Sequence, residues 1–225
     1  MKHMMNLLII AAHPDDEILG CGGTSIAYHQ KGYTIHTLLL SKGIQSRDNW
    51  TQKQYDDQVS NILRANKKIG VDEKNIHVYD YPDQRFDTIP LLDIIKTIET
   101  IKEQVKPNII FTHSNHCLNK DHTITYNAVI TATRPLPNES VKQIFSFEIP
   151  SSTEWNQPSS FSPTVFIDIK ETIEQKLRAL QEYKDEMKPF PHPRSYYGIY
   201  QHAQHIGMQI GVPFAEQFEL VRMVQ

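Results

Sequence analysis

The sequence predicts an α/β fold in which a mainly parallel β-sheet is flanked by helices. Strand-like and helix-like segments alternate along the chain, which is the pattern of βαβ units. The first segment, residues 5–10, is a short apolar run that is typical of a strand buried in a parallel sheet. The chain has 225 residues, of which 39% are hydrophobic and 22% charged, so we expect a single domain over residues 1–225.

The alternation defines six strands and six helices. Strands are expected at residues 5–12, 33–41, 75–79, 108–112, 143–148 and 164–169. Helices are expected at residues 16–31, 51–70, 91–105, 122–133, 169–187 and 195–208. Two proline-rich stretches, residues 135–163 and 188–193, are expected to be ordered loops over a site. The whole is a Rossmann-like arrangement.

The first strand and the first helix have the clearest local signals. The N-terminal apolar run resembles a signal peptide, but cleavage after Ala12 would remove the strand that carries His13. We therefore interpret it as the first strand. Carboxylates open the following helix, where the helix dipole favours them, and the glycines at residues 20–23 allow that helix to pack closely on the sheet.

A polar cluster directly follows the first strand. His13, Asp15, Asp16 and Glu17 come where the strand turns into the helix, and open α/β sheets bind ligands at the carboxyl ends of their strands. The imidazole of His13 and the carboxylate of Asp16 suit zinc, and a nearby carboxylate that is not a ligand can accept a proton from water. In the simpler interpretation, the carboxylates only cap and charge the helix.

A second histidine-rich segment supplies candidates for a third ligand. The apolar run at residues 107–112 predicts another buried strand, and it leads into His113, His116, Asp121 and His122. Because the carboxyl ends of parallel strands meet at one edge of a sheet, we expect the two clusters to lie together.

With both clusters in view, the chain resembles the PIG-L/LmbE-like superfamily of zinc-dependent N-deacetylases. Residues 12–17 and 20–23 match its first motif, A-H-P-D-D-E followed by a glycine-rich helix start. Residues 119–122 match a near variant of its second motif, H-x-D-H. The resemblance extends over essentially the whole chain, because further segments are similar to a bacterial sugar-deacetylase branch: residues 81–87, 191–195 and 214–219.

The resemblance implies a zinc site and a general base. The ligands would be His13, Asp16 and His122, and Asp15 would be the base. One position departs from the pattern, because many relatives carry a histidine where this chain has Asn119. That histidine is often assigned to oxyanion stabilisation or to protonation of the leaving group, so we expect another residue to fill the role.

His192 is the candidate for that role, because prolines on both sides restrict its backbone and could hold the ring in place. In the alternative interpretation, His192 is a structural residue of its loop. His113 and His116 lie nearer to the metal motif in the sequence, so either could support a ligand or share the acid role.

Two arginines are candidates for substrate binding. Arg47 follows the second strand at the edge that carries the metal motif, and it resembles the arginine that contacts substrate in relatives. Trp50 beside it could stack on a sugar ring. Arg85 follows the third strand and either contacts substrate or forms an ion pair that shapes the pocket. A solvated loop arginine and a tryptophan that covers apolar surface are the ordinary alternatives.

Charge and cysteine content exclude several classes of protein. A net charge of −3 offers no basic field for nucleic acid. The two cysteines, Cys21 and Cys117, form no C-x-x-C motif, so we expect no disulfide framework, no cysteine-based structural zinc and a cytoplasmic location. The first apolar run is too short to span a membrane. The glycines at residues 20–23 match a dinucleotide fingerprint poorly, because three carboxylates precede them.

Together these observations predict a metal-dependent hydrolase that removes the acetyl group from an N-acetylated amino sugar of the GlcNAc type. Its cofactor would be Zn²⁺ or another divalent ion, and its partner a small sugar substrate that is free, nucleotide-linked or glycosidic, such as a surface-glycan precursor. The sequence leaves open whether the protein forms a homo-oligomer. Two alternatives remain: an amidase for a different acylated or thiol-sugar conjugate, and a non-catalytic sugar-binding relative, which would be expected to have lost Asp15 or a ligand.

Overall fold

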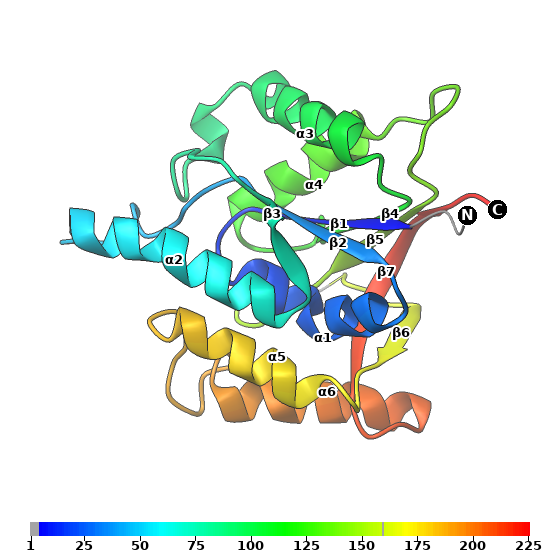
Figure 1. Cartoon of the computed structure of the whole chain (residues 1–225). Coiled ribbons are helices and arrows are strands. Elements are labelled where there is room, and N and C mark those ends of the chain that lie inside the picture. Colours follow the sequence, from blue (N-terminus) through cyan, green and yellow to red (C-terminus); the bar gives the residue numbers. More distant parts are fainter. Residues whose placement is uncertain (1–4, 159) are drawn as a thin grey trace.

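The computed structural model describes residues 5–158 and 160–225 and consists of one β-sheet between two layers of helices (Figure 1). The predicted domain at residues 1–225 and the predicted loop at residues 135–163 therefore each include residues outside this description. Within the described residues, seven strands form the sheet in the order β3-β2-β1-β4-β5-β7-β6. Strands β1 to β5 pair in parallel, whereas β7 is antiparallel to both β5 and β6. The predicted fold class is confirmed.

The strands are β1 (Asn6–Ala11), β2 (Thr34–Leu39), β3 (Val71–Val78), β4 (Ile109–His113), β5 (Gln143–Phe147), β6 (Val165–Asp168) and β7 (Ala215–Met223). The α-helices are α1 (Asp16–Gln30), α2 (Gln52–Lys68), α3 (Leu91–Val105), α4 (Lys120–Ala132), α5 (Ile173–Leu180) and α6 (Tyr196–Ile210). Two short 3₁₀ helices are η1 (Phe86–Thr88) and η2 (Gln181–Tyr183). In the part of the chain that the structure describes, no helix is both long and apolar enough to cross a membrane.

Strand β1 explains why the core has two layers. Its side chains alternate between the two faces of the sheet, and all of them from Leu7 to Ala11 are fully buried. Leu7 and Ile9 pack in the layer that contains α1 and α5, whereas Leu8 and Ile10 pack in the layer that contains α3 and α4. The two helical layers lie below and above the sheet in Figure 1.

Helix α1 approaches the sheet closely at Gly20. A side chain at this position would begin 2.4 Å from a ring carbon of Phe147 on β5, which is closer than van der Waals contact allows. The close packing expected of this glycine is therefore required by the structure.

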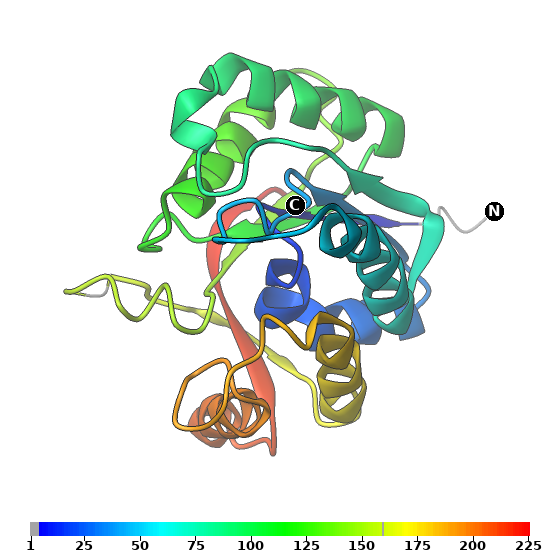
Figure 2. The ribbon, with the colours of Figure 1, turned by 90° about the vertical axis from the view of Figure 1, so that its left-hand side faces the viewer.

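The strand order creates a crevice at one edge of the sheet. Strand β1 pairs with β2 on one side and with β4 on the other, so Leu7 is opposite both Ile35 and Ile109. The chain passes from β1 to β2 on one side and from β4 to β5 on the other, so the strand order reverses between β1 and β4. Open α/β sheets bind ligands at such a point of reversal, outside the carboxyl ends of the strands. Figure 2 shows the molecule from the left-hand side of Figure 1.

Strand β7 is absent from the elements that the sequence predicts. Its buried Glu216 forms an ion pair with Lys176 at 2.7 Å, and its Glu219 accepts hydrogen bonds from the hydroxyls of Ser114 and Ser146. Carboxylates at buried and half-buried positions interrupt the alternation of apolar and polar residues by which a strand is recognised.

Three other boundaries differ from those predicted. The helix predicted at residues 169–187 is shorter, because a turn closed by the carbonyl of Ile169 precedes α5 and the 3₁₀ helix η2 follows it. Strand β3 begins at Val71 rather than at residue 75. Helix α4 begins at Lys120 because the side chain of Asn119 caps it.

Candidate active site

Three buried side chains meet at the carboxyl ends of β1 and β4. His13 lies in the turn after β1, Asp16 begins α1, and His122 lies in the first turn of α4. Asp16 Oδ2 is 3.2 Å from His13 Nδ1 and 3.2 Å from His122 Nε2, and the two nitrogens are 3.3 Å apart. The three atoms form a nearly equilateral triangle.

This triangle has the dimensions of one face of a tetrahedral metal site. Zinc bonds of about 2.0–2.1 Å place neighbouring ligand atoms about 3.3 Å apart. Two imidazole nitrogens with one carboxylate oxygen suit zinc, whereas magnesium and calcium prefer ligand sets made of oxygen. The structure thus brings together His13, Asp16 and His122 as a set that could hold a metal ion.

Asp121 holds the ring of His13 in place. Its Oδ2 is 2.9 Å from His13 Nε2, and its Oδ1 accepts the amide hydrogen of Phe86 at 2.9 Å. Asp83 Oδ1 lies 3.4 Å from the same Nε2, while Asp83 Oδ2 accepts hydrogen bonds from Ser46. His13, Asp83 and Asp121 are also close enough to hold a metal. However, Asp121 is also bonded to Phe86, and Asp83 to Ser46. These bonds mark both carboxylates as supports that orient His13 toward Asp16 and His122.

The charges around His13 favour a cation. Burial lowers the pKa of His13, but hydrogen bonds with Asp121 and Asp16 outweigh burial and raise it to about 10. Burial likewise acts to raise the pKa of Asp16, yet the neighbouring His122 and His113 hold it well below its usual range. The raised pKa of His13 reflects the carboxylates of Asp121, Asp16 and Asp83 around it, and such a negative field favours a bound cation.

Asp15 lies beside the triangle without forming part of it. Its backbone has a φ of 100°, a left-handed conformation that is unusual for a residue other than glycine, and such strain is concentrated at functional sites. Asp15 Oδ2 accepts a hydrogen bond of 3.1 Å from Arg194 Nη1. Burial raises the pKa of Asp15 well above its usual value, while Arg194 opposes this rise. Asp15 is thus a carboxylate with an increased affinity for a proton.

Glu17, the other carboxylate of the motif, is engaged by the protein. Its Oε1 accepts hydrogen bonds from the hydroxyl of Tyr183 at 2.7 Å and from Asn66 at 3.0 Å, and its Oε2 accepts the amide hydrogen of Asp15 at 3.0 Å. Burial raises the pKa of Glu17 to about 7. These bonds tie α1 to α2 and η2 and hold the strained turn at Asp15.

A pocket of about 100 Å³ opens over these residues of the candidate active site, and we call it the catalytic pocket. It is lined by His13, Asp15, Asp16 and His122 together with Arg47, Asp83, Gln84, Asn119, Glu186 and Arg194, among others. Arg47, predicted to bind substrate, thus lies in the pocket, where its guanidinium pairs with the carboxylate of Glu186. Arg85 does not line the pocket and is exposed, because the chain turns at Gln84, whose φ is 57°.

The three other predicted histidines lie around the site. His192 does not line the pocket; its Nδ1 accepts the amide hydrogen of Arg194 at 3.1 Å and its ring contacts Trp155 edge-on. His113 is fully buried, its Nε2 accepts the amide hydrogen of Ala12 at 2.9 Å, and its ring stacks on that of His122 with centroids 3.9 Å apart. His116 is half-exposed and hydrogen-bonds to Ser160.

The sequence did not identify two residues that contact the predicted site residues. Asp121 stands in the second motif, but only the fold shows that it contacts His13. Arg194 follows His192 by two residues, and its contact with Asp15 joins segments that are 179 positions apart. The proline-flanked motif at residues 191–195 was the available signal for Arg194, because such a segment is held rigid.

Comparison with known proteins decides the family. The model of the PIG-L family, described as GlcNAc-PI de-N-acetylase, matches residues 8–133, which include both motifs and more than half of the chain. The chain belongs to the PIG-L family. The predicted resemblance is confirmed, and membership of a deacetylase family supports the predicted hydrolase.

Relatives of this PIG-L protein extend the match over most of its length. The uncharacterized deacetylase YaiS of Escherichia coli is 31% identical over 184 residues, which cover 79% of this chain and 90% of that protein. A probable N-acetyl-alpha-D-glucosaminyl L-malate deacetylase 2 of Bacillus anthracis is 23% identical and covers 83% of each. A 4-oxalmesaconate hydratase of Pseudomonas putida is 24% identical over 77% of this chain and 71% of its own length.

Solved structures share the fold. The N,N'-diacetylchitobiose deacetylase of Pyrococcus horikoshii matches this PIG-L protein with a TM-score of 0.78 and 20% identity, over 98% of this chain and 85% of that one.

Proposed function

We propose that this protein is a zinc-dependent N-deacetylase that hydrolyses the acetamido group of an N-acetylated amino sugar. The proposal rests on one observation, the triangle of His13, Asp16 and His122 with the buried carboxylate of Asp15 beside it. The deacetylases among the relatives are consistent with this chemistry.

In this proposal, His13, Asp16 and His122 hold the metal ion. When bound, zinc supplies Lewis acidity toward the amide carbonyl and toward water. The carboxylate of Asp15 accepts a proton from the water that attacks the carbonyl carbon. The bond between carbon and nitrogen then breaks, and Asp15 returns the proton to the departing nitrogen, so that the products are an amine and acetate. The raised pKa of Asp15 suits a group that must hold this proton between the two steps.

Arg194 and His192 have different roles in this proposal. Arg194 orients the carboxylate of Asp15 through the hydrogen bond of 3.1 Å. The sequence suggested His192 as the acid or oxyanion donor, but His192 does not line the pocket and its Nδ1 accepts the Arg194 amide hydrogen. We therefore assign His192 to positioning Arg194, and its replacement distinguishes this role from direct catalysis. Arg47 binds substrate where it lines the pocket.

Two other reactions would use the same pocket. An amidase for another acylated conjugate would release a different acid or amine, and a hydratase, as the Pseudomonas putida relative is named, would release no acetate. A non-catalytic sugar-binding protein would bind the sugar without turnover.

The test combines metal analysis with acetate release. Purified protein is expected to contain about one zinc or similar ion per chain and to release acetate from N-acetylglucosamine or its derivatives, because three protein ligands leave one position open. His122→Ala should lose most of the metal and the activity. His116→Ala is the matched control, because His116 bonds to Ser160 and does not line the pocket. Full metal occupancy in His122→Ala, or no acetate from any N-acetyl sugar, would contradict the proposal.

A further inference from the structure

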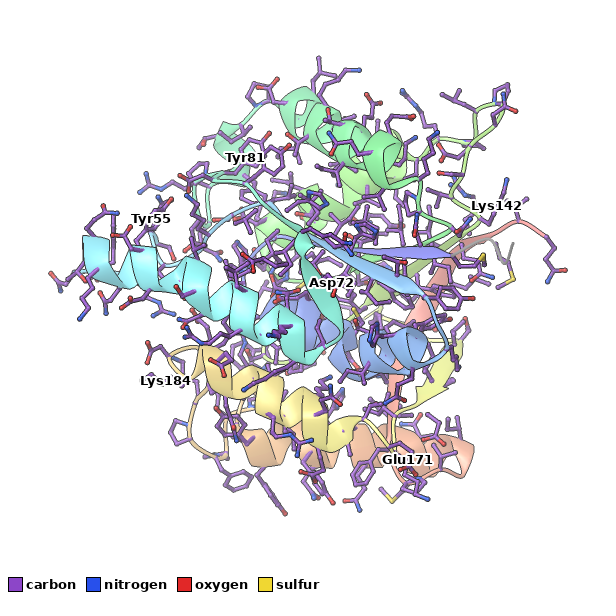
Figure 3. All side chains as sticks on the ribbon, viewed as in Figure 1. Tyr55, Asp72, Tyr81, Lys142, Glu171 and Lys184 are labelled. Carbon is purple, nitrogen blue, oxygen red and sulfur yellow. The ribbon has the colours of Figure 1, made fainter. Side chains whose placement is uncertain are left out.

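A second, larger cavity adjoins the catalytic pocket. It has a volume of about 580 Å³, and we call it the side groove. One wall is α2 with the loop before it, and the other is the segment at residues 181–186. Figure 3 labels Tyr55 on α2 and Lys184 on the opposite segment, on the same side of the molecule.

The side groove and the catalytic pocket are continuous. Ile44, Arg47 and Glu186 line both cavities, so the ion pair of Arg47 with Glu186 stands where they join. Ile44 has a φ of 64°, a left-handed conformation that is rare for a β-branched residue and marks this junction as strained. Cavities that bind small molecules typically have volumes of about 300–1,000 Å³, a range that the side groove reaches and the catalytic pocket alone does not.

The wall formed by α2 carries groups that can bind hydroxyls. Gln54, Gln58 and Asn61 lie on one face of the helix, because their spacing is close to one helical turn. Gln58 is only 6% exposed, and within the described residues its amide nitrogen donates to no hydrogen-bond partner. A side-chain donor that lines a groove and has no acceptor within the protein is free to bind a ligand oxygen.

The charge of the side groove is negative. Three basic residues line it, Arg47, Arg64 and Lys184, and five acidic residues, Asp48, Asp57, Glu182, Asp185 and Glu186. Both arginines are already paired, Arg64 with Glu182 at 2.7 Å and Arg47 with Glu186. Within the residues described, the remaining carboxylates of the groove, Asp48, Asp57 and Asp185, have no ion-pair partner, and Lys184 is the one remaining basic residue. Such a field repels anions and attracts amines.

We infer that the side groove binds a second unit of the substrate, and that this unit is a neutral or amine-bearing hydroxylated ring rather than a phosphate, nucleotide or carboxylate. The inference rests on the proposed function, because the second unit is joined to the amino sugar that loses its acetyl group. The specificity differs from that of the malate conjugate named for the Bacillus anthracis relative. We assign the preference for a neutral or amine-bearing second unit to Asp57 and Gln58.

Binding measured without turnover tests the inference directly. Asp15→Asn protein is titrated calorimetrically with N-acetylglucosamine, N,N'-diacetylchitobiose, its mono-deacetylated form that carries one amine, and UDP-N-acetylglucosamine. We expect both disaccharides to bind at least about tenfold more tightly than the monosaccharide, which corresponds to about 1.4 kcal/mol. UDP-N-acetylglucosamine should bind no more tightly than the monosaccharide. Equal binding of mono- and disaccharides, or tightest binding of the nucleotide sugar, would overturn the inference.

A pair of neighbouring carboxylates gives a matched control. Asp57 lines the side groove, whereas Asp56 does not line it and accepts a hydrogen bond from Gln52. Asp57→Lys should weaken binding of the amine-bearing disaccharide by roughly threefold to tenfold at low salt, and the loss should shrink as salt rises. Asp56→Lys makes the same change of charge and should leave this binding unaltered. Equal effects of the two variants, or none from Asp57→Lys, would overturn the assignment.

Acetate release separates this inference from the proposed function. In wild-type protein, activity on N-acetylglucosamine with no preference for disaccharides would support the function and overturn the inference. Preferential binding of disaccharides without any acetate release would support the side groove and contradict the deacetylase.

Discussion

The catalytic pocket and the side groove share a boundary but are built differently. In the pocket, His13, Asp16 and His122 are each less than 10% exposed, and hydrogen bonds fix every ring and carboxylate. In the side groove, Asp57, Arg64 and Lys184 are exposed on a helix and a loop. Because charges interact more strongly when buried than when solvated, changes in the pocket should alter activity by orders of magnitude, and changes in the groove only a few-fold.

The largest expected effect among single pocket variants that keep the metal is that of Asp15→Asn. The amide preserves the shape of the side chain but cannot accept a proton, so deacetylation should slow by roughly 10²-fold to 10⁴-fold while bound metal is retained. Initial rates of acetate release and elemental analysis measure the two quantities. Near-normal turnover at neutral pH would place the base elsewhere, with Glu17 the next candidate, and would remove the contrast between the two regions.

Asp121→Asn should have the next largest effect. Asp121 contacts the nitrogen of His13 that faces away from Asp16 and His122, and weakening such a partner lowers metal affinity or activity by about 10-fold to 100-fold. Competition with a chelator measures the affinity. The control is Asp87→Asn, an exposed carboxylate of η1, which should behave as wild type. Unchanged affinity in Asp121→Asn would show that the contact of Asp121 with His13 does not support the metal-binding triangle.

Arg194→Gln should change the pH dependence of the reaction. The charge of Arg194 lowers the pKa of Asp15, so its removal should raise that pKa further. Because the base acts in its deprotonated form, the acidic limb of the profile of kcat/KM should move to higher pH. Arg85→Gln is the control, since Arg85 does not line the pocket. A shift to lower pH, or no shift, would contradict the role given to Arg194.

Among the variants around the catalytic pocket, the smallest expected effect is that of His192→Ala. If His192 only positions Arg194, kcat should fall less than about tenfold and the acidic limb should move as in Arg194→Gln. His192→Asn should restore the wild-type profile, because an amide oxygen can accept the Arg194 amide hydrogen as Nδ1 does. A loss of kcat of about 100-fold or more in both variants would instead make His192 a catalytic donor, as the sequence suggested.

Local patterns were sufficient for much of this molecule. The apolar run that became β1 and the glycines of α1 predicted strand, helix and close packing correctly, because each depends on neighbours in the sequence. Strand β7 could not be predicted in this way. Its buried Glu216 and half-buried Glu219 are stabilised by Lys176 and by serines of other elements, which no pattern within residues 215–223 reveals.

For the site, the sequence by itself determined the identities of the metal-binding candidates and the edge of the sheet at which they would lie. His13, Asp16 and His122 follow from two motifs at strand ends, and parallel strands deliver their ends to one edge. Only the tertiary structure decided the rest: the contact of Arg194 with Asp15, the place of Arg85 outside the pocket, and the charge of the side groove. These features depend on side chains that meet across long stretches of chain, and such contacts are settled by packing and not by local spacing.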